Sequence, residues 1–311
     1  MSNLKLFAIQ NDQAVELHGE PVQLEKDLQA CVERNMETLL GVRFLASEYV
    51  TSKNHSGRID SLGLDENHFP VIVEYKRNKN HNVINQGLYY LDWLVDHQAE
   101  FQLIVADKIG EEAARKVDWT GVRLILIAEN FTKFDRYAVN QIDRTVDLFQ
   151  YSYHRAEGLG GPFLLLDLIS SQSGAVPKSD TTAPRKETTT TVRDDTHQYR
   201  LSKASPELKA LFDAVCEFAG SLGDVQMKEL KHNVAFKNIK NFVSVLVYPT
   251  QDPMVRLYVK LSPTEFELEN GFTEDVTGKG HWGTGDLAVF IRNWSDLEKA
   301  KPLIEQSYRE N

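Results

Sequence analysis

The segment 170–198, SSQSGAVPKSDTTAPRKETTTTVRDDTHQ, constrains the fold more than any other part of this chain. It is rich in Ser, Thr, Pro and charged residues and almost free of large apolar ones. It therefore cannot bury enough surface to offset the entropy lost on ordering. We expect a flexible linker over 170–204, joining two separately folded domains over 1–169 and 205–311, both of ordinary domain size.

The composition limits the class of protein. The 311 residues are 41% hydrophobic and 26% charged, as is typical of globular proteins. The two cysteines, Cys31 and Cys216, are too far apart in the sequence for a disulfide framework or a metal-ligand motif. The N-terminus has no signal-peptide pattern, and the longest apolar runs are shorter than the roughly 20 residues of a membrane span. We expect a soluble, cytoplasmic protein without membrane contact.

The order of the expected elements indicates how each domain is built. Residues 1–169 are predicted to form a mixed sheet flanked by helices. The expected elements are, in order, an opening hairpin, a helix over 22–40, a strand hairpin, a helix from about Val83, a buried strand, a helix and two closing strands. In 205–311, a helix from Pro206 to about Ser221 precedes several short strands. A final helix follows, with Ser295 as the expected cap, so a small α+β domain is predicted.

The stretch GRIDSLGLDENHFPVIVEYKRNKN, residues 57–80, places three charged side chains near one point. Side chains alternate along a strand, so Glu74 and Lys76 share one face. If the hairpin turns at residues 66–68, Asp60 lies opposite Glu74 and on that same face. Two adjacent carboxylates repel each other unless a proton or a cation lies between them. Oxygen ligands of this kind suit Mg²⁺ or Mn²⁺, and the lysine could orient a water and stabilise charge on a phosphoryl oxygen.

These residues resemble the PD-(D/E)XK nuclease superfamily, in particular the branch of the NucS endonuclease and the RecB-type nucleases. The features that carry the resemblance are GRID, then EYK fourteen residues later, then a helix with QGLYY, in which Gln86 and Tyr90 match a Gln-x-x-x-Tyr motif. Ile59 stands where the family name has a proline. The resemblance covers roughly residues 22–127 and implies a restriction-endonuclease-like fold, Mg²⁺ or Mn²⁺ as cofactor, and DNA as substrate. The C-terminal domain resembles a domain of unknown function that is fused to such nuclease-like domains and sometimes labelled a predicted transport protein.

The family usually carries a further metal ligand, a glutamate, on its first helix. Here Glu25, Glu33 and Glu37 are available. At about 100° per residue, Glu25 falls about 50° from the centre of the apolar stripe near Leu39, whereas Glu33 and Glu37 are expected on the solvated face. We therefore assign Glu25, Asp60 and Glu74 as metal ligands and Lys76 as the residue that assists the water.

The helix after Lys76 carries two faces in the predicted fold. Gln86 and Tyr90 are one turn apart on a polar and aromatic face, and the resemblance implies that they support the site and contact nucleic acid. The alternative is that the aromatic residues of this face simply pack in the core.

The net charge of −10 argues against a general polyanion binder, so DNA contact would depend on local cations. The candidates are Arg58, Arg77 and Lys79, with a surface ion pair as the alternative for Arg58.

Three functions are compatible with the sequence. The first is a metal-dependent endonuclease that hydrolyses phosphodiester bonds in DNA. The second is a catalytically inactive nuclease fold that binds nucleic acid. The third is a protein-interaction module, with a protein partner or a second copy of the chain, in which the motif residues form structural ion pairs. The complete set of Asp60, Glu74, Lys76, Gln86 and Tyr90 favours the first, because a fold used only for binding does not need both carboxylates.

Overall fold

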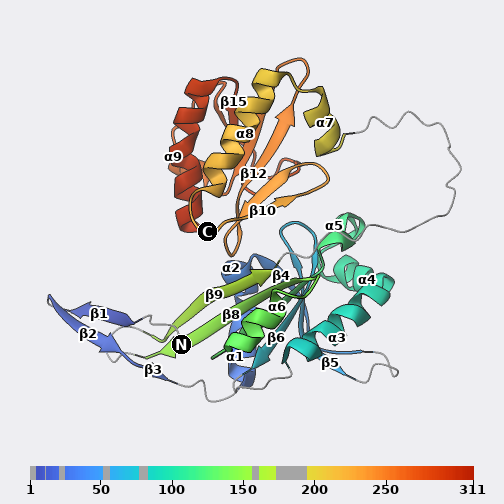
Figure 1. Cartoon of the computed structure of the whole chain (residues 1–311), viewed down its shortest axis with the longest axis vertical. Helices are drawn as coiled ribbons and strands as arrows, with labels where there is room; N and C mark the ends of the chain where they lie inside the picture. The colour runs from blue at the N-terminus through green and yellow to red at the C-terminus, as the bar shows by residue number, and fades with distance from the viewer. Residues whose placement is uncertain are drawn as a thin grey trace, which may run out of the picture. The chain divides into compact units, whose positions relative to one another are not determined.

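The computed structural model describes residues 5–10, 12–20, 25–51, 57–76, 83–155, 161–172 and 195–311. The chain divides into two compact units, Met1–Ser179 and Asp180–Asn311, each described here by itself (Figure 1). Both ends of the predicted 170–204 linker are structured. Strand β9 (Phe163–Gln172) enters it because it pairs with β8, and helix α7 (His197–Lys203) occupies its other end, capped by Thr196. Residues 173–194 lie outside the described residues.

In the described part of the first unit, seven strands form one mixed sheet, as predicted. The order is β3-β8-β7-β6-β5-β4, with β9 beside β8. The two central pairings, β6 with β7 and β7 with β8, are parallel, and the others are antiparallel. The strands are β3 (Gly19–Glu20), β4 (Val42–Val50), β5 (Arg58–Asp65), β6 (Pro70–Lys76), β7 (Arg123–Ala128) and β8 (Thr145–His154). The predicted opening hairpin forms a separate two-stranded sheet from β1 (Leu6–Gln10) and β2 (Gln13–Leu17).

Helices cover both faces of this sheet (Figure 1). One face packs against α3 (Val83–Asp96), α4 (Gln98–Lys108), α5 (Glu111–Lys116) and α6 (Lys133–Val139) around a core that includes Leu62, Ile72 and Leu124. Gly87 permits the close approach of α3, because a Cβ there would lie 2.7 Å from the Leu124 side chain. The other face holds α1 (Glu25–Arg34) and α2 (Met36–Leu40).

The predicted helix over 22–40 is interrupted. Its described part ends at Arg34 and restarts at Met36. Asn35 causes the break by local bonding: its backbone N–H donates to the Val32 carbonyl three residues back, and its side-chain amide donates to the Cys31 carbonyl at 2.8 Å. The second segment closes at Gly41, whose φ of 65° suits glycine.

The hairpin of β5 and β6 turns where predicted, at residues 66–68. The Asp65 carboxylate stabilises the turn by accepting from the backbone N–H groups of Asn67, at 2.8 Å, and Phe69, at 3.0 Å. The register pairs Ser61 with Val73 and continues to Leu64 with Pro70. At the other end, one residue before Ser61, this register brings Asp60 opposite Glu74.

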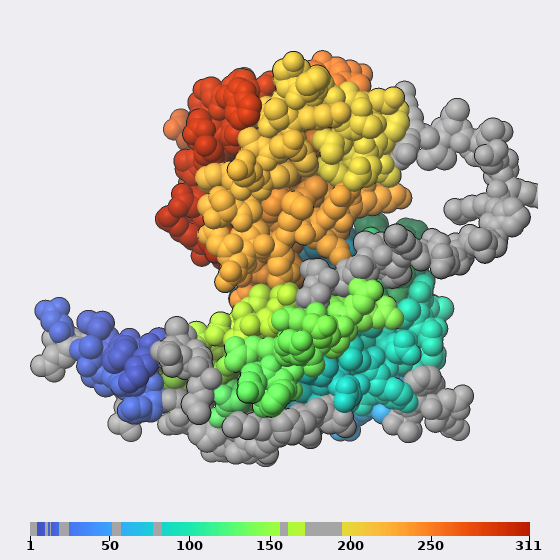
Figure 2. All heavy atoms as spheres, viewed as in Figure 1, coloured from blue at the N-terminus to red at the C-terminus, as the bar shows by residue number. Residues whose placement is uncertain are grey.

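The second unit has the predicted α+β architecture. Its sheet has the order β10-β11-β12-β13-β15-β14, with every neighbouring pair antiparallel. The strands are β10 (Gln226–Glu229), β11 (Val234–Lys237), β12 (Asn241–Tyr248), β13 (Met254–Val259), β14 (Thr273–Asp275) and β15 (Leu287–Ile291). Helices α8 (Pro206–Gly220) and α9 (Trp294–Glu310) pack side by side and cover one sheet face (Figures 1 and 2). The cap of α9 is Asn293, whose side chain accepts from the Asp296 N–H, and not the predicted Ser295.

None of the helices in the described residues has the length and apolar character to span a membrane.

Candidate functional site

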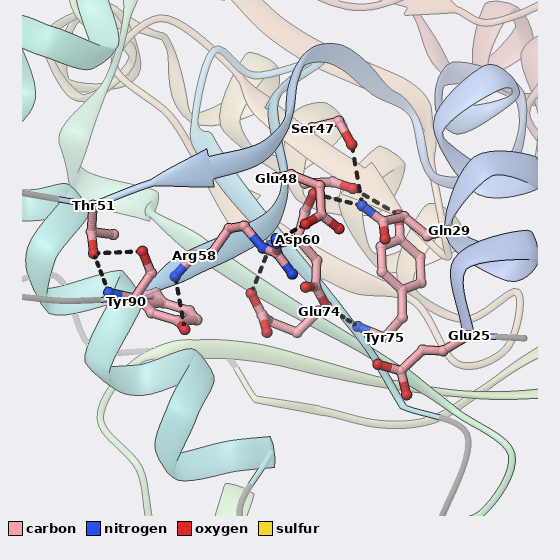
Figure 3. Close-up of polar contacts among 12 residues, drawn as sticks. Glu25, Gln29, Ser47, Glu48, Thr51, Arg58, Asp60, Glu74, Tyr75 and Tyr90 are labelled. Atoms are coloured by element: carbon pink, nitrogen blue, oxygen red, sulfur yellow. Dashed lines mark hydrogen bonds and ion pairs between the residues drawn. The ribbon is translucent and has the colours of Figure 1, made fainter.

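The β5–β6 ladder ends at two carboxylates, which replace its next backbone hydrogen bonds (Figure 3). Glu74 Oε1 accepts from the backbone N–H of Asp60 at 3.1 Å. In return, Asp60 Oδ2 accepts from the backbone N–H of Tyr75, also at 3.1 Å. The structure thus brings Asp60 and Glu74 together at the point where the two strands separate, and each carboxylate holds the opposite strand.

Burial makes this carboxylate pair unfavourable as two anions. Glu74 has no exposed surface, and its Oε2 has no hydrogen-bond partner among the described residues. Burial, followed by the charge of Asp60, raises the pKa of Glu74 to about 8. Burial also raises the pKa of Asp60, against the hydrogen bond from Tyr75 and the charge of Lys76. The pair therefore retains a proton near neutral pH unless a cation takes its place.

Lys76 and Glu25 complete the charged cluster. Lys76 ends β6, and its Nζ lies 3.4 Å from Oε1 of Glu25 at the start of α1. The Lys76 charge lowers the pKa of both Asp60 and Glu74, whereas the Glu25 charge raises both. All four predicted charged residues therefore interact electrostatically. Within the described ranges, however, no group of three or more His, Cys, Asp or Glu side chains is arranged to hold a metal ion, and Glu25 contacts Lys76.

Glu33 differs from its predicted position on the solvated face. Its Oε1 accepts from Ser61 Oγ at 2.6 Å and from Gln29 Nε2 at 2.9 Å. The prediction was wrong because the helical phase was measured from Leu39, which lies beyond the break at Asn35. Within α1 alone, Glu25 and Glu33 each lie one turn from the buried Gln29, so both flank the sheet-facing side. Glu37, on α2, is exposed as predicted.

Gln29 is a site residue that the sequence analysis missed. Its amide donates to Glu33, to Ser47 Oγ at 3.2 Å and to the Asp60 carbonyl at 2.9 Å (Figure 3). A buried glutamine on an apolar helix stripe was the signal that could have indicated it, because a buried amide needs partners.

Gln86 and Tyr90 brace the site from α3, and Tyr90 is buried rather than open to solvent. The Tyr90 hydroxyl accepts from the Arg58 backbone N–H at 3.2 Å, and Gln86 Nε2 donates to that hydroxyl at 3.3 Å. Tyr90 is only 6% exposed to solvent and belongs to the core. The predicted polar and aromatic face is therefore a packed face, and its polar ends hold the strand that carries Asp60.

Arg58 forms the surface ion pair that was the alternative to a phosphate contact. Its Nε lies 2.5 Å from Oε2 of Glu48. Glu48 was not predicted: it stands in mid-strand in the left-handed region, with φ of 52°. A bulge between Phe44 and Ala46 shifts the register so that Glu48 faces Asp60, whose pKa it raises. Arg77 and Lys79, the other candidate DNA contacts, lie outside the described residues.

Comparisons with known proteins found a family model that matches the second unit and a relative that matches almost the whole chain. A family model, Domain of unknown function (DUF5655), matches residues 198–311, in agreement with the predicted resemblance of the second domain. An uncharacterized protein of Haemophilus influenzae is 26% identical over 314 residues, covering 99% of this chain and 100% of that protein. The sequence similarity therefore extends over both units of this chain.

Two solved structures resemble part of the chain. A repair endonuclease from Pyrococcus abyssi matches 43% of this chain and 49% of its own, with 18% identity and a TM-score of 0.29. EndoMS in a complex with double-stranded DNA matches 42% of this chain and 47% of its own, with 19% identity and a TM-score of 0.25. The matched part thus spans about half the length of each solved structure.

Proposed function

We propose that the first unit is a divalent-metal-dependent nuclease that hydrolyses phosphodiester bonds in DNA. One observation carries the proposal: the buried carboxylate of Glu74 lies beside that of Asp60, with its Oε2 unpartnered among the described residues and its pKa raised to about 8. A structural ion pair would not need two acids in this position, because a single carboxylate opposite Lys76 would be cheaper to bury.

The donor set fits Mg²⁺ or Mn²⁺. Carboxylate oxygens are the ligands that such hard cations select, and Oε2 of Glu74 offers one that no donor among the described residues occupies. Asp60 and Glu74 would hold the ion, and Glu25 would join them on leaving Lys76. When bound, the ion would polarise the phosphate and lower the pKa of a water ligand.

The remaining residues have roles that their contacts support. Lys76, released from Glu25, would orient the attacking water and stabilise negative charge on the phosphoryl oxygens. Gln86 and Tyr90 act through the backbone of Arg58, two residues before Asp60, and are positioning residues. In this proposal the metal ion replaces Lys76 as the partner of Glu25. The catalytic position of Lys76 would therefore form only when the metal is bound.

The test is an incubation of the purified full chain with single-stranded, double-stranded and branched DNA, with Mn²⁺, with Mg²⁺ and with EDTA. Divalent-dependent cleavage that Glu74→Gln removes and Glu37→Gln leaves intact would support the proposal, since Glu37 is exposed on a neighbouring helix. Binding of DNA without cleavage of any form would favour a nuclease fold used only for binding. Neither cleavage nor binding would favour a protein-interaction module.

A further inference from the structure

The second unit carries two arginines on the sheet face that α8 and α9 leave uncovered. Side chains of β12, β13 and β15 alternate between the two faces, and Val245 and Leu257 point to the α8–α9 core. Tyr248, Arg256 and Phe290 belong to the opposite face, where a second, smaller apolar cluster lies.

Arginine and aromatic side chains alternate across this face. The Arg200 guanidinium, from α7, lies 4.9 Å from the ring centroids of both Trp282 and Tyr248. Arg256 continues the row, 4.5 Å from the Tyr248 ring and 4.9 Å from the Phe290 ring. We call Arg200, Tyr248, Arg256 and Trp282 the arginine–aromatic face.

Both guanidinium groups on this face have a buried N–H without an acceptor. Arg200 is only 7% exposed, and its Nε and Nη2 both donate to Asp195 Oδ1, which leaves the buried Nη1 without a partner in the described residues. The Arg256 side chain hydrogen-bonds to Tyr258, but its buried Nε has no acceptor among the described residues. Buried guanidinium N–H groups without acceptors are costly, so they indicate an anionic ligand with several acceptor oxygens.

The glycine-rich segment 278–285 adds a stacking group to the same face. Gly283 lies against the sheet, where a Cβ would meet the Tyr258 ring at 2.7 Å. The Thr284 N–H also donates to Ser244 Oγ at 3.0 Å. These two contacts with the sheet hold Trp282 beside Arg200. The Trp282 ring stacks on His232 at 4.4 Å and still retains 42% of its exposed surface. A partly exposed indole, beside two guanidinium groups that each keep one N–H without an acceptor among the described residues, suits a ligand with both flat rings and phosphates.

We propose that the arginine–aromatic face binds a single strand of nucleic acid. Phosphates would accept from the guanidinium groups of Arg200 and Arg256. The face of an unpaired base would pack on the exposed edge of Trp282, whose two ring faces contact His232 and Arg200. A single strand is favoured over a duplex because the faces of its unpaired bases are free to pack on the exposed edge of the indole. The proposal does not depend on cleavage by the first unit, since it concerns binding by residues of the second.

The test is the affinity of the full chain for a short fluorescent single-stranded oligodeoxythymidylate, measured by anisotropy in EDTA so that no cleavage occurs. Arg256→Gln and Trp282→Ala are expected to weaken binding about tenfold each. The matched control is Arg309→Gln, an exposed arginine paired with Glu305 on α9, which should leave the affinity unchanged.

Three results would overturn the proposal: no binding by the wild type, equal affinity in all variants, or thymidine monophosphate binding as tightly as the strand. Arg256→Met separates a binding role from a structural one. If Arg256 were purely structural, replacing it would lower the melting temperature. Its guanidinium has a buried N–H without an acceptor among the described residues, so replacing it should leave the melting temperature unchanged or raised while the affinity falls. A lower melting temperature with unchanged affinity would contradict the proposed site.

Discussion

Glu74 accepts a hydrogen bond from the backbone N–H of Asp60, with Oε1 3.1 Å from the nitrogen. This bond fixes one oxygen of a wholly buried carboxylate and leaves the other, Oε2, without a partner among the described residues. The two acids are therefore held together by the backbone, independently of whether either is ionised. The predictions below follow from that arrangement.

The stability of the metal-free protein should decrease as pH rises from about 5 to about 8. Because the folded-state pKa of Glu74 is raised from 4.5 to about 8, the folded protein keeps a proton that the unfolded chain loses over this range. The stabilisation is complete below the unfolded pKa and is lost as pH rises through the folded one. Thermal melts in EDTA should show Glu74→Gln with a flatter pH profile than the wild type; parallel profiles would contradict the raised pKa.

Mg²⁺ or Mn²⁺ should raise the melting temperature, and more at pH 8 than at pH 6, because the ion competes with the proton on the pair. At a metal concentration of 100 times Kd the gain is about 2.7 kcal/mol. Asp60→Asn should remove the shift, whereas Glu37→Gln, on an exposed residue, should retain it. A shift that survives in Asp60→Asn would place the ion elsewhere.

Lys76→Ala should lower DNA cleavage about 10²–10³-fold, as is typical for loss of one group that stabilises developing charge. The metal-induced rise in melting temperature should persist or increase, because the change frees Glu25 from its 3.4 Å contact with Lys76. Single-turnover cleavage and anisotropy with the same DNA separate the two effects. Equal losses in binding and cleavage would instead make Lys76 a DNA-binding residue.

Glu25→Gln and Glu33→Gln should have different consequences. The first should reduce cleavage with little change in stability, because the Glu25 side chain is 41% exposed. The second should destabilise the fold by roughly 1–3 kcal/mol, since Glu33 accepts from both Ser61 and Gln29. Thermal melts and cleavage rates on both variants, with Glu37→Gln as control, check this order. The reverse pattern would make Glu33 the third ligand.

Tyr90→Phe should destabilise the first unit by about 1–3 kcal/mol, because the Arg58 N–H loses its acceptor. For a domain of this size that corresponds to a fall in melting temperature of roughly 2–9 °C. Cleavage should fall as well, since the strand that carries Asp60 is less constrained. Tyr89→Phe, on a side chain that is 46% exposed, is the control and should be near neutral.

The sequence was sufficient for those features that depend on neighbours along the chain. Alternation along β5 and β6 and the polar turn at residues 66–68 determine the hairpin register, so the approach of Asp60 to Glu74 could be predicted. The mixed sheet of the first unit and the α+β character of the second follow from element order in the same way.

The tertiary structure alone decided the features that depend on how elements pack. The position of Glu33 changed because a single break at Asn35 resets the helical phase, and Glu48 faces Asp60 because a one-residue bulge shifts β4. The arginine–aromatic face combines residues from α7, β12, β13 and a glycine-rich loop. No local periodicity relates such residues, since their proximity is set by the packing of α7 and the loop on the sheet, which sequence patterns do not specify.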